Sequence, residues 1–185
     1  VVWDIGANFG LHSITLKHLH PEIQLVSFEP AVAMCARLQD NAKANQVALT
    51  IQNMALNSVR GYSILHCVEG NPGMSSLRPW SGATYSDSVA VWCDTAEYLV
   101  MNQLVAIPNL IKIDVEGAEI DVLRGFGPLL RHPTMRSIVF EGSAEPDMHQ
   151  EDELFSLLRA AGFSIKPLPR SAGEAHALIN FVADR

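Results

Sequence analysis

Short apolar segments alternate with amphipathic segments along most of this chain. Runs of strand-forming residues occupy 1–4, 24–29 and 109–114. The first two runs are each followed by apolar residues at helical spacing. After the second run, for example, Met34, Leu38 and Ala42 lie four positions apart and predict a helix over 31–45. Strands that alternate with helices in this way indicate an α/β fold with a largely parallel sheet.

The same pattern predicts the other elements of one domain. Further strands of the sheet are expected at 47–55, 136–141, 163–168 and 176–183, and further helices at 11–19, 118–124 and 151–161. Gly125 is expected to end the second of these helices. The last two strands should form a hairpin at the sheet edge, with a turn at 171–173. An extra strand pair is predicted at 61–69 and 88–93, followed by a short helix over 95–104 that begins with a capping box.

The first strand leads directly into a loop with two glycines. The order strand, glycine turn, helix is typical of a mononucleotide-binding unit. A dinucleotide site favours G-x-G-x-x-G, whereas Gly6-Ala-Asn-Phe-Gly10 has Asn8 at the position of the middle glycine. Asp4, at the end of the strand, would repel a phosphate but suits an ammonium group. S-adenosylmethionine, a nucleoside that carries an amino acid, therefore fits this loop better than NAD.

Glu29 closes the second apolar run and is followed by Pro30. An acidic residue about 20 positions after the glycine loop is placed to accept both ribose hydroxyls of a nucleoside. In the alternative interpretation Glu29 is a solvated strand end and Asp4 a helix N-cap. That interpretation accounts for Glu29 or Asp4 taken alone, but it is weaker when both residues are considered together with the glycine loop. Met54 and Ala55, at the end of the third strand, are expected beside the adenine, with ordinary strand residues as the alternative for their side chains.

Three segments carry a resemblance to a known family. They are D-I-G-A-N-F-G at 4–10, F-E-P at 28–30 and L-I-K-I-D-V-E-G-A-E at 110–119. In this order they resemble the FkbM family of methyltransferases along nearly the whole chain. The resemblance implies a class I, Rossmann-like fold: a doubly wound, mostly parallel seven-stranded sheet of order 3-2-1-4-5-7-6. It also implies S-adenosylmethionine as cofactor and, usually, O-methylation of a hydroxyl on a small molecule or sugar.

The resemblance and the loop together give a set of expected cofactor-binding residues: Asp4, Gly6, Ala7, Asn8, Gly10, His12, Glu29, Pro30, Met54, Ala55 and Asp114. The segment 70–77 resembles a Gly/Asn-rich family segment that ends in Ser-Leu, so Ser75 and Ser76 are expected in a substrate-side lid. Class I methyltransferases usually carry a helix before the first strand. The single domain at 1–185 is therefore expected to lack its N-terminal helical segment.

Candidate catalytic residues come from the ends of neighbouring strands. Asp114, Glu116 and Glu141 are expected at the crevice of the sheet, and His149 in the loop that follows Glu141. A hydroxyl acceptor must lose a proton, and Glu141 paired with His149 is the preferred base. Lys112 shares a face with Asp114 and is placed on the substrate side, with an internal ion pair as the alternative. The three carboxylates could also bind Mg²⁺, but their spacing does not require it, and no metal is predicted.

Composition narrows the possible functions. The net charge of −7 and the absence of a Lys/Arg cluster argue against nucleic acid as a partner. No apolar run is long enough to span a membrane. The three cysteines form no CxxC pair, which argues against a zinc site and favours a reducing, cytoplasmic location. The expected partner is a small-molecule or glycan substrate, and oligomeric state leaves no readable signal. Two alternatives remain: a non-catalytic S-adenosylmethionine-binding module and a nicotinamide-dependent oxidoreductase on a similar sheet.

Overall fold

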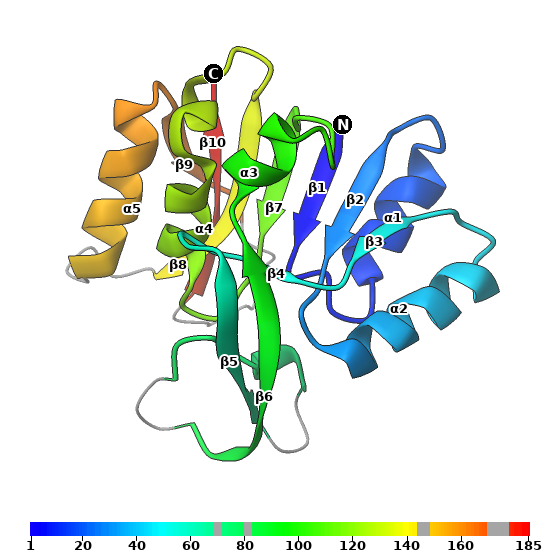
Figure 1. The fold of residues 1–185 in the computed structure, drawn as a ribbon. Helices are drawn as coiled ribbons and strands as arrows, with labels where there is room; N and C mark the ends of the chain where they lie inside the picture. The colour runs from blue at the N-terminus through cyan, green and yellow to red at the C-terminus, as the bar shows by residue number, and fades with distance from the viewer. Residues whose placement is uncertain (69–71, 80–82, 144–148, 170–177) are drawn as a thin grey trace.

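The computed structural model describes residues 1–68, 72–79, 83–143, 149–169 and 178–185. Its main sheet has seven strands in the order β3-β2-β1-β7-β8-β10-β9 (Figure 1). The strands are β1 (Val2–Ile5), β2 (Leu25–Phe28), β3 (Thr50–Gln52), β7 (Leu110–Ile113), β8 (Ser137–Ser143), β9 (Ser164–Pro167) and β10 (Leu178–Asp184). β10 is antiparallel to both of its neighbours, whereas β3, β2, β1, β7 and β8 are parallel. Because β4 to β6 belong to a second sheet, this is the expected order 3-2-1-4-5-7-6. The class I methyltransferase fold is confirmed.

Helices cover both faces of this sheet. α1 (Leu11–Leu19) and α2 (Val32–Ala44) lie on one face, and α3 (Ala96–Met101), α4 (Glu119–Phe126) and α5 (His149–Ala160) on the other (Figure 1). A short 3₁₀ segment, Gly127–Arg131, follows α4. A strand that is buried on both faces reads as a continuous apolar run, which is why the sequence pattern located the central strands.

The central strand β1 shows how the two faces are filled. Trp3 is fully buried and packs against Phe28 and Phe126, with ring centroids 5.0 and 5.5 Å away. Its indole Nε1 donates to the carbonyl of Ala106 at 3.1 Å. Asp4, one position later, points to the opposite face because strand side chains alternate. It is also fully buried, so its charge must be compensated inside the protein.

A second, three-stranded sheet has the order β4-β6-β5. It consists of β4 (Ala55–Leu56), β5 (Gly61–Val68) and β6 (Tyr85–Asp94), and its β5–β6 hairpin extends beyond the carboxyl ends of the parallel strands (Figure 1). The extra strand pair was predicted, but the prediction of one strand over 47–55 is wrong. The Asn53 side-chain amide donates to the carbonyls of Glu29 and Pro30 at 2.9 and 3.0 Å. These bonds fix a bend after β3, and the chain then joins the second sheet.

Two other boundary predictions are wrong. Gly125 does not end a helix but lies inside α4, where an added Cβ would stand 2.1 Å from the carbonyl oxygen of Asn57. The glycine therefore permits close packing against that backbone, and Gly127, with φ +51°, caps the helix. His149 is the first residue of α5, not part of the preceding loop. The predicted turn at 171–173 lies outside the described residues.

None of the helices described here is long and apolar enough to cross a membrane.

Candidate active site

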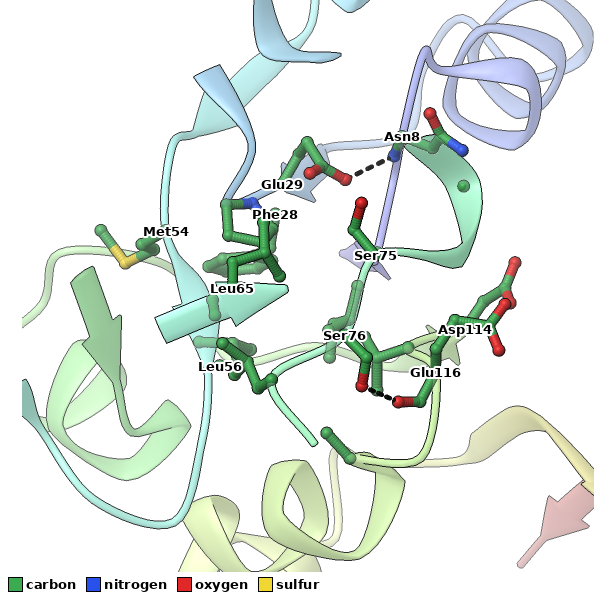
Figure 2. Close-up of a pocket in the computed structure, with 18 residues that line it drawn as sticks. Asn8, Phe28, Glu29, Met54, Leu56, Leu65, Ser75, Ser76, Asp114 and Glu116 are labelled. Carbon is green, nitrogen blue, oxygen red and sulfur yellow. Dashed lines mark hydrogen bonds between the residues drawn. The ribbon is translucent and has the colours of Figure 1, made fainter. Parts of the chain in front are cut away.

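The carboxyl ends of β1, β2 and β7 surround a pocket. The space inside it, counted together with the open mouth, is about 690 Å³. One wall is apolar, carboxylates stand at its edges, and part of the β5–β6 connection closes another side (Figure 2). The apolar wall consists of Ile5, Phe28, Met54, Ala55, Leu56 and Leu65.

The glycine loop reaches the pocket with Gly6 and Asn8. Both have positive φ, +76° and +50°, which glycine and asparagine adopt at low cost. An added Cβ at Gly6 would lie 1.9 Å from the carbonyl oxygen of Asp114. The glycine is therefore required where β1 and β7 meet.

Glu29 is the anchored carboxylate of the pocket. It is only 7% exposed, and its two oxygens accept the backbone N–H groups of Asn8 at 2.9 Å and Ala31 at 2.8 Å. Burial raises the pKa of this carboxyl, and the two backbone hydrogen bonds oppose the rise. Each carboxylate oxygen keeps a further lone pair for a ligand donor.

Asp4 and Lys112 form an internal ion pair instead of lining the pocket. Lys112 Nζ lies 2.9 Å from Asp4 Oδ1 and 3.2 Å from Asp114 Oδ2. Ser13 Oγ donates to the other oxygen of Asp4 at 2.5 Å. Burial alone would lower the pKa of Lys112, but the two carboxylates outweigh it and raise that pKa. Lys112 therefore makes an internal ion pair, which was the alternative to a place on the substrate side.

A second acidic group gathers at the end of β7. Asp114 and Glu116 line the pocket. Burial first, and then the charges of Asp114 and Glu141, raise the pKa of Glu116. Burial also raises the pKa of Glu119 to about 7, aided by Glu116 and Asp114. Sequence reasoning missed Glu119, although its position three residues after Glu116, where a helix begins, is a signal that could have found it.

The predicted lid contributes Gly73, Ser75, Ser76 and Leu77 to the pocket wall. Ser75 points toward Glu29 and Asn8 in Figure 2, so it stands at the Glu29 end of the pocket. Ser76 is 2% exposed, and its hydroxyl donates to the backbone carbonyl of Glu116. Ser76 thus uses its hydroxyl to hold the loop in place.

Other predicted residues lie away from the pocket. Ala7 is buried and its N–H bonds to the carbonyl of Phe28. An added Cβ at Gly10 would meet the side chain of Leu38 at 2.1 Å, so this glycine serves helix packing. His12 is exposed on α1. Glu141 is half-buried in β8, opposite Asn180 of β10.

The proposed Glu141–His149 pair remains a prediction, since the side chain of His149 lies outside the described residues. Within the part of the chain that the structure describes, no three His, Cys, Asp or Glu side chains are grouped so that they could hold a metal ion.

The pocket fits S-adenosylmethionine by the chemistry of its walls. The apolar wall suits an adenine ring, and the lone pairs of Glu29 suit a ribose diol. Asp114, whose side chain is 44% exposed, offers a carboxylate to the ammonium group at the other end.

Comparisons with known proteins show which sequences this chain resembles. The sequence profile of the Methyltransferase FkbM domain matches residues 4–165. The chain is 28% identical to 31-O-demethyl-FK506 methyltransferase FkbM of Streptomyces tacrolimicus, over 89% of this chain and 73% of the relative. It is 23% identical to the hexuronic acid methyltransferase AglP of Haloferax volcanii, over 79% of this chain and 58% of the relative.

A solved structure shows the same fold. Methyltransferase FkbM from Methylobacillus flagellatus KT superposes with a TM-score of 0.68 at 12% identity, over all of this chain and 43% of that protein. The chain thus spans between less than half and about three quarters of the length of these proteins.

Proposed function

This chain belongs to the FkbM methyltransferase family, and from that premise we propose that it transfers a methyl group from S-adenosylmethionine to a hydroxyl oxygen of a small molecule or sugar. The single observation that carries the cofactor assignment is Glu29. Its carboxylate is buried at the pocket edge, and both of its oxygens are already oriented by backbone N–H groups. Such preorganisation suits recognition of a ribose diol.

When bound, S-adenosylmethionine supplies a methyl group that its sulfonium already activates. The protein therefore has to bind and orient. Glu29 holds the ribose, and the apolar wall around Phe28 and Met54 excludes water from the adenine. Asp114 holds the ammonium group. Alignment of this kind can contribute about 7–11 kcal/mol to lowering the barrier.

The acceptor hydroxyl also has to lose its proton. Glu116 lies in the pocket wall, and its raised pKa brings it closer to the range that suits a general base. We assign Glu116 Oε as a proton acceptor, with Glu141 contributing the charge that helps to raise its pKa. A positioned base of this kind contributes about 10²–10⁴-fold to the rate.

The acceptor class rests on the relatives. One is named for a demethylated FK506 and another for a hexuronic acid, and both names point to oxygen-rich small molecules or sugars. An acceptor that offers a hydroxyl matches the need for a base at Glu116.

The cofactor assignment is tested by calorimetric titration with S-adenosylhomocysteine and, separately, with NADH. We expect micromolar binding of S-adenosylhomocysteine, no binding of NADH, and at least tenfold weaker S-adenosylhomocysteine binding for Glu29→Ala, about 1.4 kcal/mol. Glu22→Ala, on an exposed turn, is the matched control and should bind like the wild type. Binding of NADH alone would indicate an oxidoreductase, and equal affinity of the two variants would remove Glu29 from the site.

A further inference from the structure

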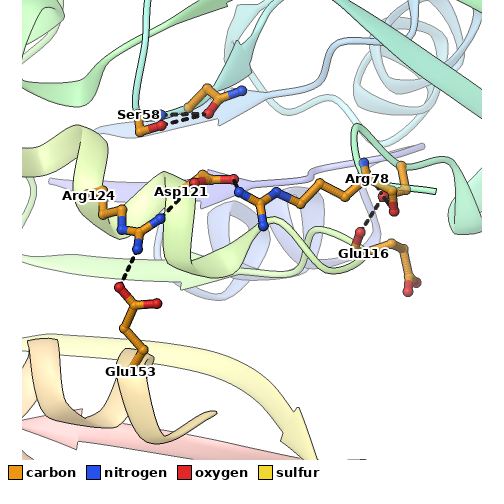
Figure 3. A network of polar contacts seen from close by, with 8 residues as sticks. Ser58, Arg78, Glu116, Asp121, Arg124 and Glu153 are labelled. Atoms are coloured by element: carbon orange, nitrogen blue, oxygen red, sulfur yellow. Dashed lines mark hydrogen bonds and ion pairs between the residues drawn. The ribbon is translucent and has the colours of Figure 1, made fainter. Parts of the chain in front are cut away.

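The segment 72–78, here called the 72–78 loop, is fixed to the main domain at two points. It belongs to the connection between β5 and β6, yet the Ser76 hydroxyl bonds to the Glu116 carbonyl in the β7–α4 turn. Arg78, two residues later, forms an ion pair with Asp121 of α4, with Nη2 and Oδ2 2.5 Å apart (Figure 3). Ser76 is also tied back to β5, through two backbone hydrogen bonds with His66 of 2.8 and 3.0 Å.

Asp121 is the buried partner of Arg78 in this ion pair. It is 6% exposed, and a carboxylate at such a position requires a cation or several donors. Its two oxygens face different arginines: Oδ2 pairs with Arg78, and Oδ1 lies 3.4 Å from Arg124 Nη1. Arg124 also pairs with Glu153 of α5 (Figure 3). Arg78 makes the shorter contact to Asp121, and it joins α4 to the connection between β5 and β6.

The attachment of the 72–78 loop affects the wall of the pocket. Gly73, Ser75, Ser76 and Leu77 form part of its wall, and Ser75 points toward Glu29 and Asn8 (Figure 2). The second sheet, whose β5–β6 connection carries them, has a small hydrophobic core of its own, formed by Ala55, Leu65, Val91 and Cys93. The two polar contacts of Ser76 and Arg78 therefore set where this wall stands relative to Glu29.

We propose that Arg78 is a positioning residue of the cofactor site: through Asp121 it holds the 72–78 loop against the pocket, and it places the Ser75 hydroxyl as a further contact for the ribose beside Glu29. This inference rests on the proposed cofactor for its second half only. The placement of the loop by Arg78 does not depend on which ligand binds.

The chain supplies a matched control for Arg78. The side chains of Arg78 and Arg124 are 45% and 44% exposed, and both pair with Asp121. Arg124 lies on the same helix as Asp121, so its loss removes a cation from Asp121 without releasing the 72–78 loop. Arg78→Met and Arg124→Met thus differ in whether the loop loses its attachment.

The first measurement is amide hydrogen exchange of the ligand-free protein. We expect Arg78→Met to speed exchange of the amides at 74–78 at least tenfold, most clearly at Ser76, whose N–H donates to His66. Arg124→Met should leave these amides within threefold of the wild type. Arg78→Lys should fall between, because an ammonium keeps the charge but loses the planar fork of the guanidinium. Equal exchange in the two methionine variants would overturn the role of Arg78.

The second measurement is S-adenosylhomocysteine affinity in the same variants, together with the melting temperature. We expect about tenfold weaker binding for Arg78→Met and about threefold for Ser75→Ala, with melting temperatures no lower than that of Arg124→Met. Wild-type affinity in Arg78→Met or in Ser75→Ala would overturn the ribose contact. A wild type that binds no S-adenosylhomocysteine overturns the cofactor, and the exchange comparison still decides the role of Arg78.

Discussion

At the β2 end of the pocket one carboxylate, that of Glu29, accepts a backbone N–H on each oxygen. At the β7 end Asp114, Glu116 and Glu119 stand near one another, and Lys112 pairs with the first of them. Burial raises a pKa at both ends. At Glu29 the backbone hydrogen bonds oppose that rise, whereas at Glu116 the neighbouring carboxylates add to it.

The difference separates binding from proton transfer. A carboxylate with two fixed donors keeps its orientation and suits recognition of a neutral diol. Glu116 and Glu119, whose pKa values are raised, hold and release protons closer to neutral pH, which suits the removal of a proton from an acceptor. The following substitutions test whether the β2 end and the β7 end of the pocket act independently.

The largest effect is expected at Lys112, which pairs with Asp114 at the β7 end and with Asp4 of β1. Lys112→Met leaves the fully buried Asp4 without its cation, and breaking such a pair costs about 3–5 kcal/mol. Urea unfolding measures the loss. Lys166→Met, at an exposed edge position, should change the free energy of unfolding by less than about 0.5 kcal/mol. Adding Asp4→Asn to Lys112→Met should recover at least half of the loss, and no recovery would mean that the buried charge is not the cause.

The second effect concerns Gly6, where β1 meets β7. Gly6→Ala has to accommodate both a positive φ and a Cβ 1.9 Å from the Asp114 carbonyl oxygen, so we expect a loss of about 3 kcal/mol or more. Gly117→Ala is the matched control, because Gly117 has nearly the same φ, +77°, with no atom within 4 Å of the added Cβ. It should cost about 1–2 kcal/mol. Equal losses in urea unfolding would contradict the close approach of the two strands.

The third effect is the pH dependence of stability at Glu119. Its pKa is about 7 in the folded protein, against 4.5 ordinarily. Between these values the folded protein keeps a proton that the unfolded chain has lost, so the free energy of unfolding falls as pH rises. Glu119→Gln should therefore be more stable than the wild type above pH 7, by at most about 3 kcal/mol.

This gain should vanish below pH 4.5, where both states of the wild type are protonated. Urea unfolding at pH 4 and pH 8 measures it, with the exposed Glu22→Gln as control. A gain of the same size at both pH values would show that packing, not the charge, is responsible.

The smallest effect is expected at Asn8. Its backbone N–H, not its side chain, bonds to Glu29, and its positive φ is open to glycine. Asn8→Gly should change stability by less than about 1 kcal/mol and S-adenosylhomocysteine affinity by less than twofold. A tenfold loss of affinity in calorimetry would instead assign the Asn8 amide to the ligand.

The sequence by itself determined the sheet and the positions at its crevice. Apolar runs located β1, β2 and β7, and the polar residues that close or follow them located Glu29, Asp114 and Glu116. This worked because strand patterning is local and because parallel strands bring their carboxyl ends to one edge. The glycine loop was equally readable, since positive φ restricts the residue type.

Only the tertiary structure decided how charges and loops are paired. Asp4 is at a strand end like Glu29, yet it faces α1 and pairs with Lys112, 108 positions away. Gly125 resembled a helix stop, but it lies against Asn57. No sequence pattern identified Arg78, because its proposed role depends on the ion pair with Asp121, which forms only in the folded protein. The periodicity of the sequence indicates which face of a strand or helix a side chain occupies. Its interaction partner on that face belongs to a distant segment of the sequence, and only folding brings the two together.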